Sequence, residues 1–136
     1  LRNTHHRIRL KGAPLYVIGI DDERSGHDDV EAALAGLPPD GSRLVLTHTP
    51  PTVLQLPRGA GLLCLTGHTH GGQIKLPGIT RGLMRRLGQP FERGLHQVNG
   101  NFVYVNRGLG YGIGGAMVRL GSKPEVSFFT LRRKSR

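Results

Sequence analysis

Two short, continuously apolar segments constrain the fold of this 136-residue chain more than any other feature. Residues 44–46 (LVL) and residues 62–65 (LLCL) contain only apolar side chains. Runs of this length are typical of β-strands that are buried on both faces, as in a parallel sheet. Between strand-like segments lies a predicted helix, residues 30–35, with Asp28 and Asp29 at its N-terminus. The sequence therefore predicts an α/β fold with a strand-rich mixed sheet and few helices.

Further strands are predicted where apolar residues cluster between turn signals. They comprise residues 7–10, 15–20, 96–98, 102–105, 116–120 and 126–131. Asn99-Gly100-Asn101 indicates a hairpin, because a tight primed turn needs residues that accept positive φ. Residues 108–115 contain five glycines and are predicted to form a loop. We expect residues 1–131 to belong to one folded domain and residues 132–136 to form a solvated basic tail.

The charge of the chain is strongly positive and unevenly distributed. Nineteen Lys and Arg against nine Asp and Glu give a net charge of +10, and Glu92 and Glu125 are the only acids after residue 40. Clustered basic residues can bind a phosphate backbone. However, the chain has no Trp and only 5% aromatic residues, so it lacks a platform for stacking single-stranded bases. The composition therefore does not favour a specific nucleic-acid partner.

Residues 80–87 are predicted to form a short basic helix. Leu83, Met84 and Leu87 would share one side of it, next to Arg81, Arg85 and Arg86. We expect the apolar side to pack on the sheet. The alternative is a non-enzymatic basic module that binds nucleic acid or an anionic membrane. No apolar segment approaches the roughly 20 residues of a membrane-spanning helix, and no signal-peptide pattern is present, which favours a cytoplasmic or membrane-peripheral location.

Three of the seven histidines follow the two apolar segments closely. His48 comes just after the first segment, and His68 and His70 lie in a glycine-rich loop just after the second. The carboxyl ends of parallel strands meet at one edge of a sheet, where open α/β sheets bind ligands. Imidazole nitrogen suits zinc, iron and similar metals. The pattern therefore indicates a metal site, whereas we interpret the remaining histidines and Cys64 as ordinary structural residues.

These segments resemble a known family. LVLTHTP (residues 44–50) and LLCLTGHTHGGQI (residues 62–74) look like the second half of a calcineurin-like metallophosphoesterase of the bacterial membrane-associated phosphodiesterase type. The likeness extends to YVIGIDD, FVYVNRGLGY and PEVSFFTL, and so covers nearly the whole chain. It implies that residues 1–131 are the C-terminal portion of the family's αββα sandwich.

The resemblance also assigns roles to residues of the two histidine segments. It implies that His48 and His68 ligate one metal of a binuclear centre and that His70 ligates the other. Thr69, Gly71 and Gln73 would belong to the substrate loop beside this centre. The intact enzyme would hold two divalent ions (Mn, Fe, Zn or similar) and act on a phosphate ester, including one linked to a lipid.

The family's earlier motifs do not occur in this sequence. Asp-x-His, Gly-Asp and Gly-Asn-His-Asp/Glu are all absent, and Asp21-Asp22-Glu23 does not match them. Two divalent ions about 3.5–4 Å apart need a bridging carboxylate to offset their repulsion. The histidine that serves as the family's general acid is missing too, so no catalytic residue is assigned in this chain. We therefore expect a fragment of a two-metal phosphoesterase that hydrolyses mono- or diesters by metal-activated water and is inactive alone.

One further enzymatic alternative is open at this point. Three histidines and a water molecule satisfy a catalytic zinc ion. A self-contained site of this kind requires His48, His68 and His70 to converge on a single ion.

Overall fold

The computed structural model describes residues 1–38, 41–76, 78–110, 112–113, 116–117 and 119–132. A six-stranded sheet in the order β1-β2-β3-β4-β6-β5 forms its centre. Its strands are β1 (Thr4–Leu10), β2 (Ala13–Gly19), β3 (Ser42–Leu46), β4 (Leu63–Thr66), β5 (Gly94–Val98) and β6 (Asn101–Val105). The four inner strands are mutually parallel, and β1 and β5 are antiparallel edge strands. The predicted α/β class with a mixed sheet is confirmed.

Short helices connect these strands, and a small hairpin follows the last of them. They are η1 (Glu23–Ser25), α1 (Val30–Leu34), η2 (Pro50–Gln55), η3 (His70–Gly72), α2 (Thr80–Arg86) and the pair β7 (Gly112–Ile113) and β8 (Ala116–Met117). Asp29 caps α1, because its carboxylate accepts a hydrogen bond of 2.8 Å from the Ala32 amide. Asn99 and Gly100 take positive φ between β5 and β6, as the hairpin prediction requires. Among the described residues, no helix has the length and apolar character needed to span a membrane.

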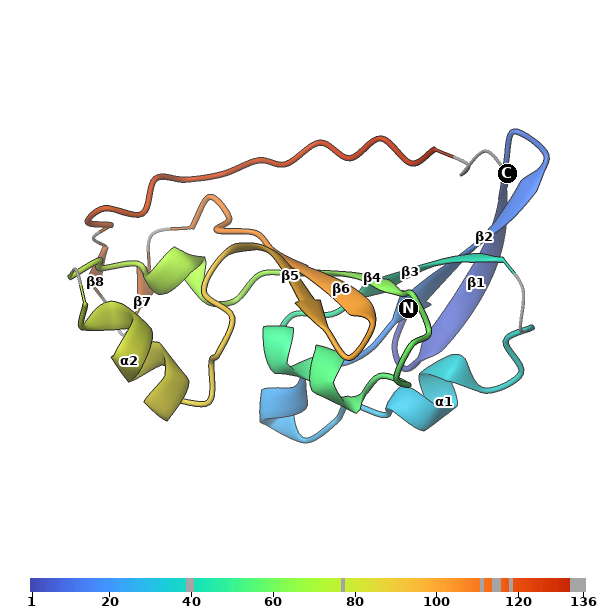
Figure 1. The fold of residues 1–136 in the computed structure, drawn as a ribbon, viewed down its shortest axis with the longest axis horizontal. Coiled ribbons are helices and arrows are strands. Elements are labelled where there is room, and N and C mark those ends of the chain that lie inside the picture. Colours follow the sequence, from blue (N-terminus) through green and yellow to red (C-terminus); the bar gives the residue numbers. More distant parts are fainter. Residues whose placement is uncertain (39–40, 77, 111, 114–115, 118, 133–136) are drawn as a thin grey trace.

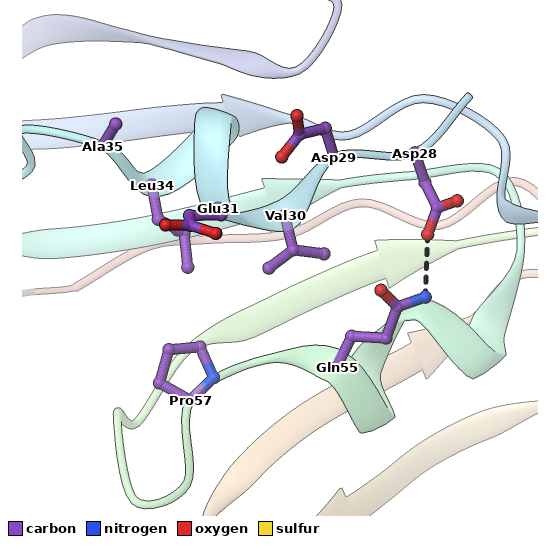
Figure 2. Close-up of a pocket in the computed structure, with 8 residues that line it drawn as sticks. All are labelled: Asp28, Asp29, Val30, Glu31, Leu34, Ala35, Gln55 and Pro57. Atoms are coloured by element: carbon purple, nitrogen blue, oxygen red, sulfur yellow. Dashed lines mark hydrogen bonds between the residues drawn. The ribbon is translucent and has the colours of Figure 1, made fainter. Parts of the chain in front are cut away.

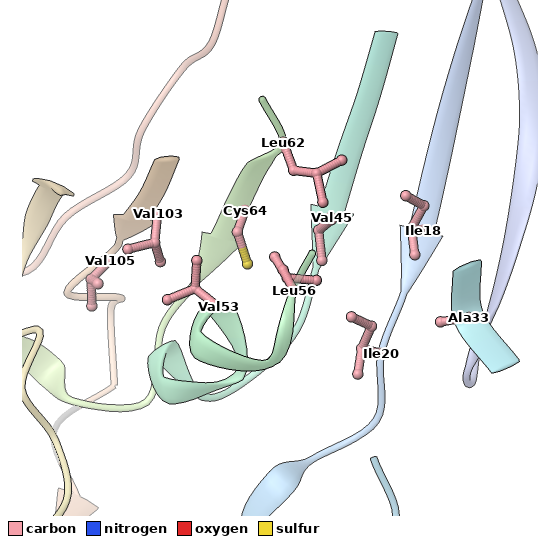
Figure 3. Packing of buried hydrophobic residues seen from close by; sticks show 10 residues of the cluster. All are labelled: Ile18, Ile20, Ala33, Val45, Val53, Leu56, Leu62, Cys64, Val103 and Val105. Atoms are coloured by element: carbon pink, nitrogen blue, oxygen red, sulfur yellow. The ribbon is translucent and has the colours of Figure 1, made fainter. Parts of the chain in front are cut away.

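The hydrophobic core lies on one face of the sheet. Ile18, Val45, Cys64 and Val103 come from the four parallel strands and are completely buried, together with Val53 of η2 (Figure 3). Helices α1 and η2 cover this face (Figure 1). Burial raises the pKa of the Cys64 thiol to about 12, so this cysteine is a core residue without thiolate character. Its predicted structural role is confirmed.

Among the described residues, a single extended segment crosses the opposite face of the sheet. The chain after β8 runs along this face (Figure 1), and the Phe129 ring packs edge-on against Tyr104 with 5.0 Å between ring centroids. Leu46 and Phe102 nevertheless stay 40% and 39% exposed, and Leu95 is 62% exposed. The sheet therefore has a packed face and a largely open apolar face.

Three predictions about the C-terminal third need correction. Residues 126–131, all of which the structure describes, form no strand, because they cross the sheet face instead of joining its hydrogen-bonded edge. The loop predicted over residues 108–115 contains β7. Of the strand predicted over residues 116–120, residue 118 lies outside the described residues, and the described ones form β8 and one isolated bridge at Leu120. Glycines permit a short hairpin here as readily as a loop. The basic tail from residue 133 lies outside the described residues.

The expected packing of α2 is also wrong. All seven residues of α2 are described, and none of them is buried. The helix lies beside the loop that carries η3 and away from the main sheet (Figure 1). The local sequence therefore predicts the helix but does not predict the segment that the helix packs against.

Candidate metal centre

His48 and His68 lie next to each other at the carboxyl edge of the sheet. They follow the adjacent parallel strands β3 and β4, and the Gly67 amide donates to the His48 carbonyl at 3.1 Å. The His48 Nε2 and His68 Nδ1 atoms are 3.0 Å apart, and the two rings meet edge-on with centroids 4.9 Å apart. The structure thus brings together the two histidines that the sequence places at neighbouring strand ends.

Arg24 is a third group at this edge, and sequence reasoning missed it. It lies in η1, after strand β2, and its Nη1 atom is 2.9 Å from His68 Nε2. A guanidinium can only donate, so His68 Nε2 accepts, and the ring proton on Nδ1 is donated to His48 Nε2. Three adjacent parallel strands therefore each contribute one group to a hydrogen-bonded chain. The rule that locates the histidines would also have located Arg24, had it been applied to the end of β2.

The surroundings of His68 favour a neutral imidazole. Burial lowers its pKa below the usual value, and the neighbouring His48 and Arg24 lower it further. A neutral imidazole carries the lone pair that a metal ion requires. His68 therefore has the protonation state of a ligand.

His70 is held by a separate set of contacts. Its Nδ1 atom is 2.8 Å from Gln73 Oε1, which can only accept, so the ring proton lies on Nδ1 and the lone pair on Nε2. The Ser122 hydroxyl donates to the His70 carbonyl at 2.6 Å. A histidine that donates one ring nitrogen to an oxygen and presents the other is the usual form of a metal ligand.

The loop that carries these histidines has an unusual backbone. His68, His70 and Gln73 have φ values of 65°, 50° and 37°, which side-chain-bearing residues rarely adopt. Such conformations cost on the order of 1 kcal/mol each and concentrate at functional sites. Residues 68–73 therefore form a loop whose shape is maintained at an energetic cost.

The three residues predicted for the substrate loop are buried inside this loop. Thr69 and Gln73 are 5% and 2% exposed, and Gly71 is buried as well. The Thr69 hydroxyl donates to the Glu92 carbonyl at 2.6 Å and accepts from the Gly71 amide at 3.3 Å. These contacts hold the backbone around His70, and a role in substrate contact stays a prediction.

Gly71→Ala tests how tightly this loop is packed. A Cβ atom at residue 71 would lie 2.7 Å from Arg107 Cγ and 2.7 Å from Ser122 Oγ, and φ is +63°. We expect the substitution to lower the free energy of unfolding by about 1–3 kcal/mol in urea denaturation. Gly82→Ala in α2 is the control, because its Cβ would meet no atom within 4 Å. Equal effects of the two substitutions would contradict this packing.

His48, His68 and His70 could supply some of the ligands of a metal centre, but not all of them. His48 and His68 are in contact, but the described part of the chain contains no group of three or more His, Cys, Asp or Glu side chains arranged to hold an ion. The nearby acids have other partners: Asp21 pairs with Arg2 at 2.7 Å, and Asp22 caps η1. The convergence that a single-zinc site needs is therefore not formed in this structure, and the imidazoles provide a partial site.

A separate hollow lies between α1 and η2 and belongs to a different part of the surface. It has a volume of about 730 Å³, and its lining includes Asp28, Asp29, Glu31, Leu34 and Gln55 (Figure 2). Gln55 Nε2 donates to Asp28 Oδ2 at 2.7 Å. None of the three histidines lines this hollow.

Comparison with known proteins identifies relatives along most of the chain. It is 33% identical to the uncharacterized metallophosphoesterase YkuE of Bacillus subtilis, over 96% of this chain and 46% of the relative. It is 30% identical to the UDP-2,3-diacylglucosamine pyrophosphatase LpxG of Chlamydia trachomatis, over 93% of this chain and 41% of that protein. Identity to the phosphodiesterase YaeI of Escherichia coli is 33%, over 74% of this chain and 34% of YaeI.

No family model matches the chain, and no solved structure is significantly similar to it. The chain spans about half the length of the Bacillus relative, and less of the other two. YkuE is described as a metallophosphoesterase and YaeI as a phosphodiesterase, and the fold is the α/β arrangement expected of half such a domain. This chain therefore belongs to the calcineurin-like metallophosphoesterase family.

Proposed function

We propose that this chain is the C-terminal portion of a phosphate-ester hydrolase and supplies the imidazole ligands of its binuclear metal centre. The contact between His48 and His68, at the ends of adjacent parallel strands, is the observation that carries the proposal. His70 presents its Nε2 lone pair from the neighbouring loop. Bound divalent ions would polarise the phosphoryl group and activate a water molecule as the nucleophile.

The residues of the chain orient the centre rather than transfer protons. Gln73 holds the ring of His70, and Thr69 holds the backbone of the loop. The Arg24 guanidinium donates a hydrogen bond to His68 Nε2, which is the atom that would bind a metal ion. A metal ion held by His68 Nε2 would displace the Arg24 guanidinium, and the charge of Arg24 would then be available to a phosphate oxygen of the substrate.

The carboxylate ligands of the centre come from outside these 136 residues in this proposal. Two observations support a divided domain. The described residues contain no three-ligand group, and the sheet leaves one apolar face largely uncovered. In an αββα sandwich a second sheet covers that face. The name of the LpxG relative, a diacylglucosamine pyrophosphatase, supports a lipid-linked phosphate ester as the substrate class.

The isolated chain provides the direct test. We expect no turnover of bis(p-nitrophenyl) phosphate in the presence of Mn²⁺, and weak, easily chelated metal binding, because a bridging carboxylate is missing. Metal content is measured by elemental analysis before and after dialysis against EDTA. Turnover by the isolated chain that disappears in His68→Ala would contradict the division of the site. Finding the Asp-x-His, Gly-Asp and Gly-Asn-His motifs encoded upstream of Leu1 would support it.

A further inference from the structure

Helix α2 and the residues before it expose an apolar face that lacks a partner among the described residues. Ile79, Leu83 and Leu87 recur at helical spacing and are 62%, 53% and 64% exposed. Leu76 extends the same stripe by one turn and is 48% exposed. Side chains at this spacing lie on one face of a helix, and in a globular domain that face is normally buried. We call these four residues the α2 apolar face.

The opposite side of the helix faces the rest of the chain. Arg81, Met84 and Arg85 line a hollow together with Glu92 and His96 of the neighbouring segment. The apolar side of the amphipathic helix therefore faces outward, whereas Arg81 and Arg85 line this hollow on the other side of the helix and remain exposed. This is the reverse of the orientation that packing against the sheet would produce.

The charge around this face identifies the partner. Residues 75–93 contain five basic side chains and a single acid, Glu92, which pairs with Lys75 at 2.9 Å. Arg81, Arg85 and Arg86 are all exposed on α2. Arg86 borders the α2 apolar face, three residues after Leu83, and Arg81 and Arg85 lie on the polar side of the same helix. An amphipathic helix with this distribution matches the boundary between acyl chains and anionic headgroups. A nucleic acid would use the arginines but not the leucines.

The α2 segment is firmly joined to the candidate metal centre. The Thr80 hydroxyl donates to the Ile74 carbonyl at 3.0 Å and accepts from the Leu76 amide at 2.8 Å. Gly72, next to the His70 loop, packs so closely that a Cβ atom there would lie 2.8 Å from Thr80 Cγ2. A binding partner that fixes the position of α2 therefore also fixes the position of the loop that carries His70.

We propose that the α2 apolar face docks this protein on an anionic lipid surface, with the histidine loop held at the membrane boundary. The docking itself is independent of catalysis. The role of this docking is to present a phosphate ester in the lipid layer to the metal centre. This role rests on the function proposed above.

Vesicle sedimentation tests the docking without metal or substrate. We expect the chain to bind phosphatidylcholine vesicles that contain about 30% phosphatidylglycerol and to bind pure phosphatidylcholine vesicles much more weakly. Leu83→Ala/Leu87→Ala should weaken binding about tenfold or more, because two partly inserted leucines are shortened. Arg86→Gln, next to the apolar face, should weaken binding about fivefold.

Matched controls separate this face from the other exposed leucines. Leu54→Ala/Leu95→Ala shortens two leucines that are 50% and 62% exposed on η2 and β5, and it should leave binding unchanged. Circular dichroism checks that each variant is folded. Equal binding to neutral vesicles, or an unchanged affinity in Leu83→Ala/Leu87→Ala, would overturn the proposal. So would a concentration-dependent dimer that this double variant dissociates, because the occupant would then be a second copy.

The failure of this proposal differs from a failure of the proposed function. If docking is absent but a protein that completes the site hydrolyses soluble bis(p-nitrophenyl) phosphate, the docking proposal alone is wrong. If docking is present but no such hydrolysis occurs, the proposed function is wrong and the lipid surface remains as the partner.

Discussion

Replacing His68 by alanine is expected to lower phosphodiesterase turnover at least 100-fold in a protein that joins this chain to the carboxylate ligands proposed to lie outside it. Loss of groups that merely orient a ligand typically costs about 10–100-fold in metal affinity or activity. His68 contacts both His48 and Arg24, so its removal takes away a proposed ligand and also separates its neighbours. Turnover of bis(p-nitrophenyl) phosphate and the metal content of the protein are the two measurements.

His96→Ala is the matched control for this experiment. Like His68, His96 is partly buried, but it lies in β5 at the edge of the sheet, where its Nε2 atom is 2.9 Å from the Arg93 carbonyl oxygen. We expect turnover and metal content to stay within about twofold of the parent protein. An equal loss of activity in both variants, or a His68→Ala variant with full metal content and full turnover, would contradict a ligand role for His68.

Lowering the pH is expected to release the C-terminal segment from the sheet. Glu125 begins the stretch that crosses the open face, and its side chain is 14% exposed. Burial raises its pKa, but hydrogen bonds from Ser127, Tyr104 and Arg107 outweigh burial and lower the pKa from 4.5 to about 2. The Arg107 Nε and Ser127 Oγ atoms both lie 2.6 Å from the carboxylate.

The sign of the effect follows from the direction of this shift. Because the pKa of Glu125 is lower in the folded state, its ionised form stabilises the fold above about pH 4.5, and this contribution is lost between about pH 4.5 and pH 2. The shift corresponds to a contribution on the order of 3 kcal/mol. Glu125→Gln should therefore be less stable than the parent chain at about pH 7 and nearly equal to it at about pH 2.

Urea denaturation of both proteins across this pH range measures the difference. Glu31→Gln on α1 is the control, because Glu31 is exposed and forms no ion pair among the described residues. We expect its stability to follow that of the parent chain at every pH. A difference between Glu125→Gln and the parent chain that does not change with pH would show that the carboxylate network contributes nothing through its charge.

Local patterns in the sequence were sufficient to predict the parallel strands and the position of the site. The apolar run at residues 44–46 forms the second half of β3, and residues 63–65 of the other run lie in β4. The expectation that these strands are buried on both faces is wrong, because Val45 and Cys64 are fully buried on the core face whereas Leu46 on the other face is 40% exposed. Because parallel strands end at one edge, the proximity of His48 and His68 followed from their places in the sequence. Capping of α1 by Asp29 was equally local, since an N-cap contact spans only three residues.

Contacts between distant segments were decided by the tertiary structure. The alternating residues 126–131 look like a strand, but a strand needs a free hydrogen-bonding edge, and nothing local shows where that edge lies. Arg24 reaches His68 only because β2 and β4 flank β3. The sequence by itself determined which segments form strands, where the histidines emerge and that residues 80–86 form an amphipathic helix. Only the tertiary structure decided that the apolar side of this helix faces outward, because helix formation depends on neighbours three and four residues away whereas burial depends on partners far along the chain.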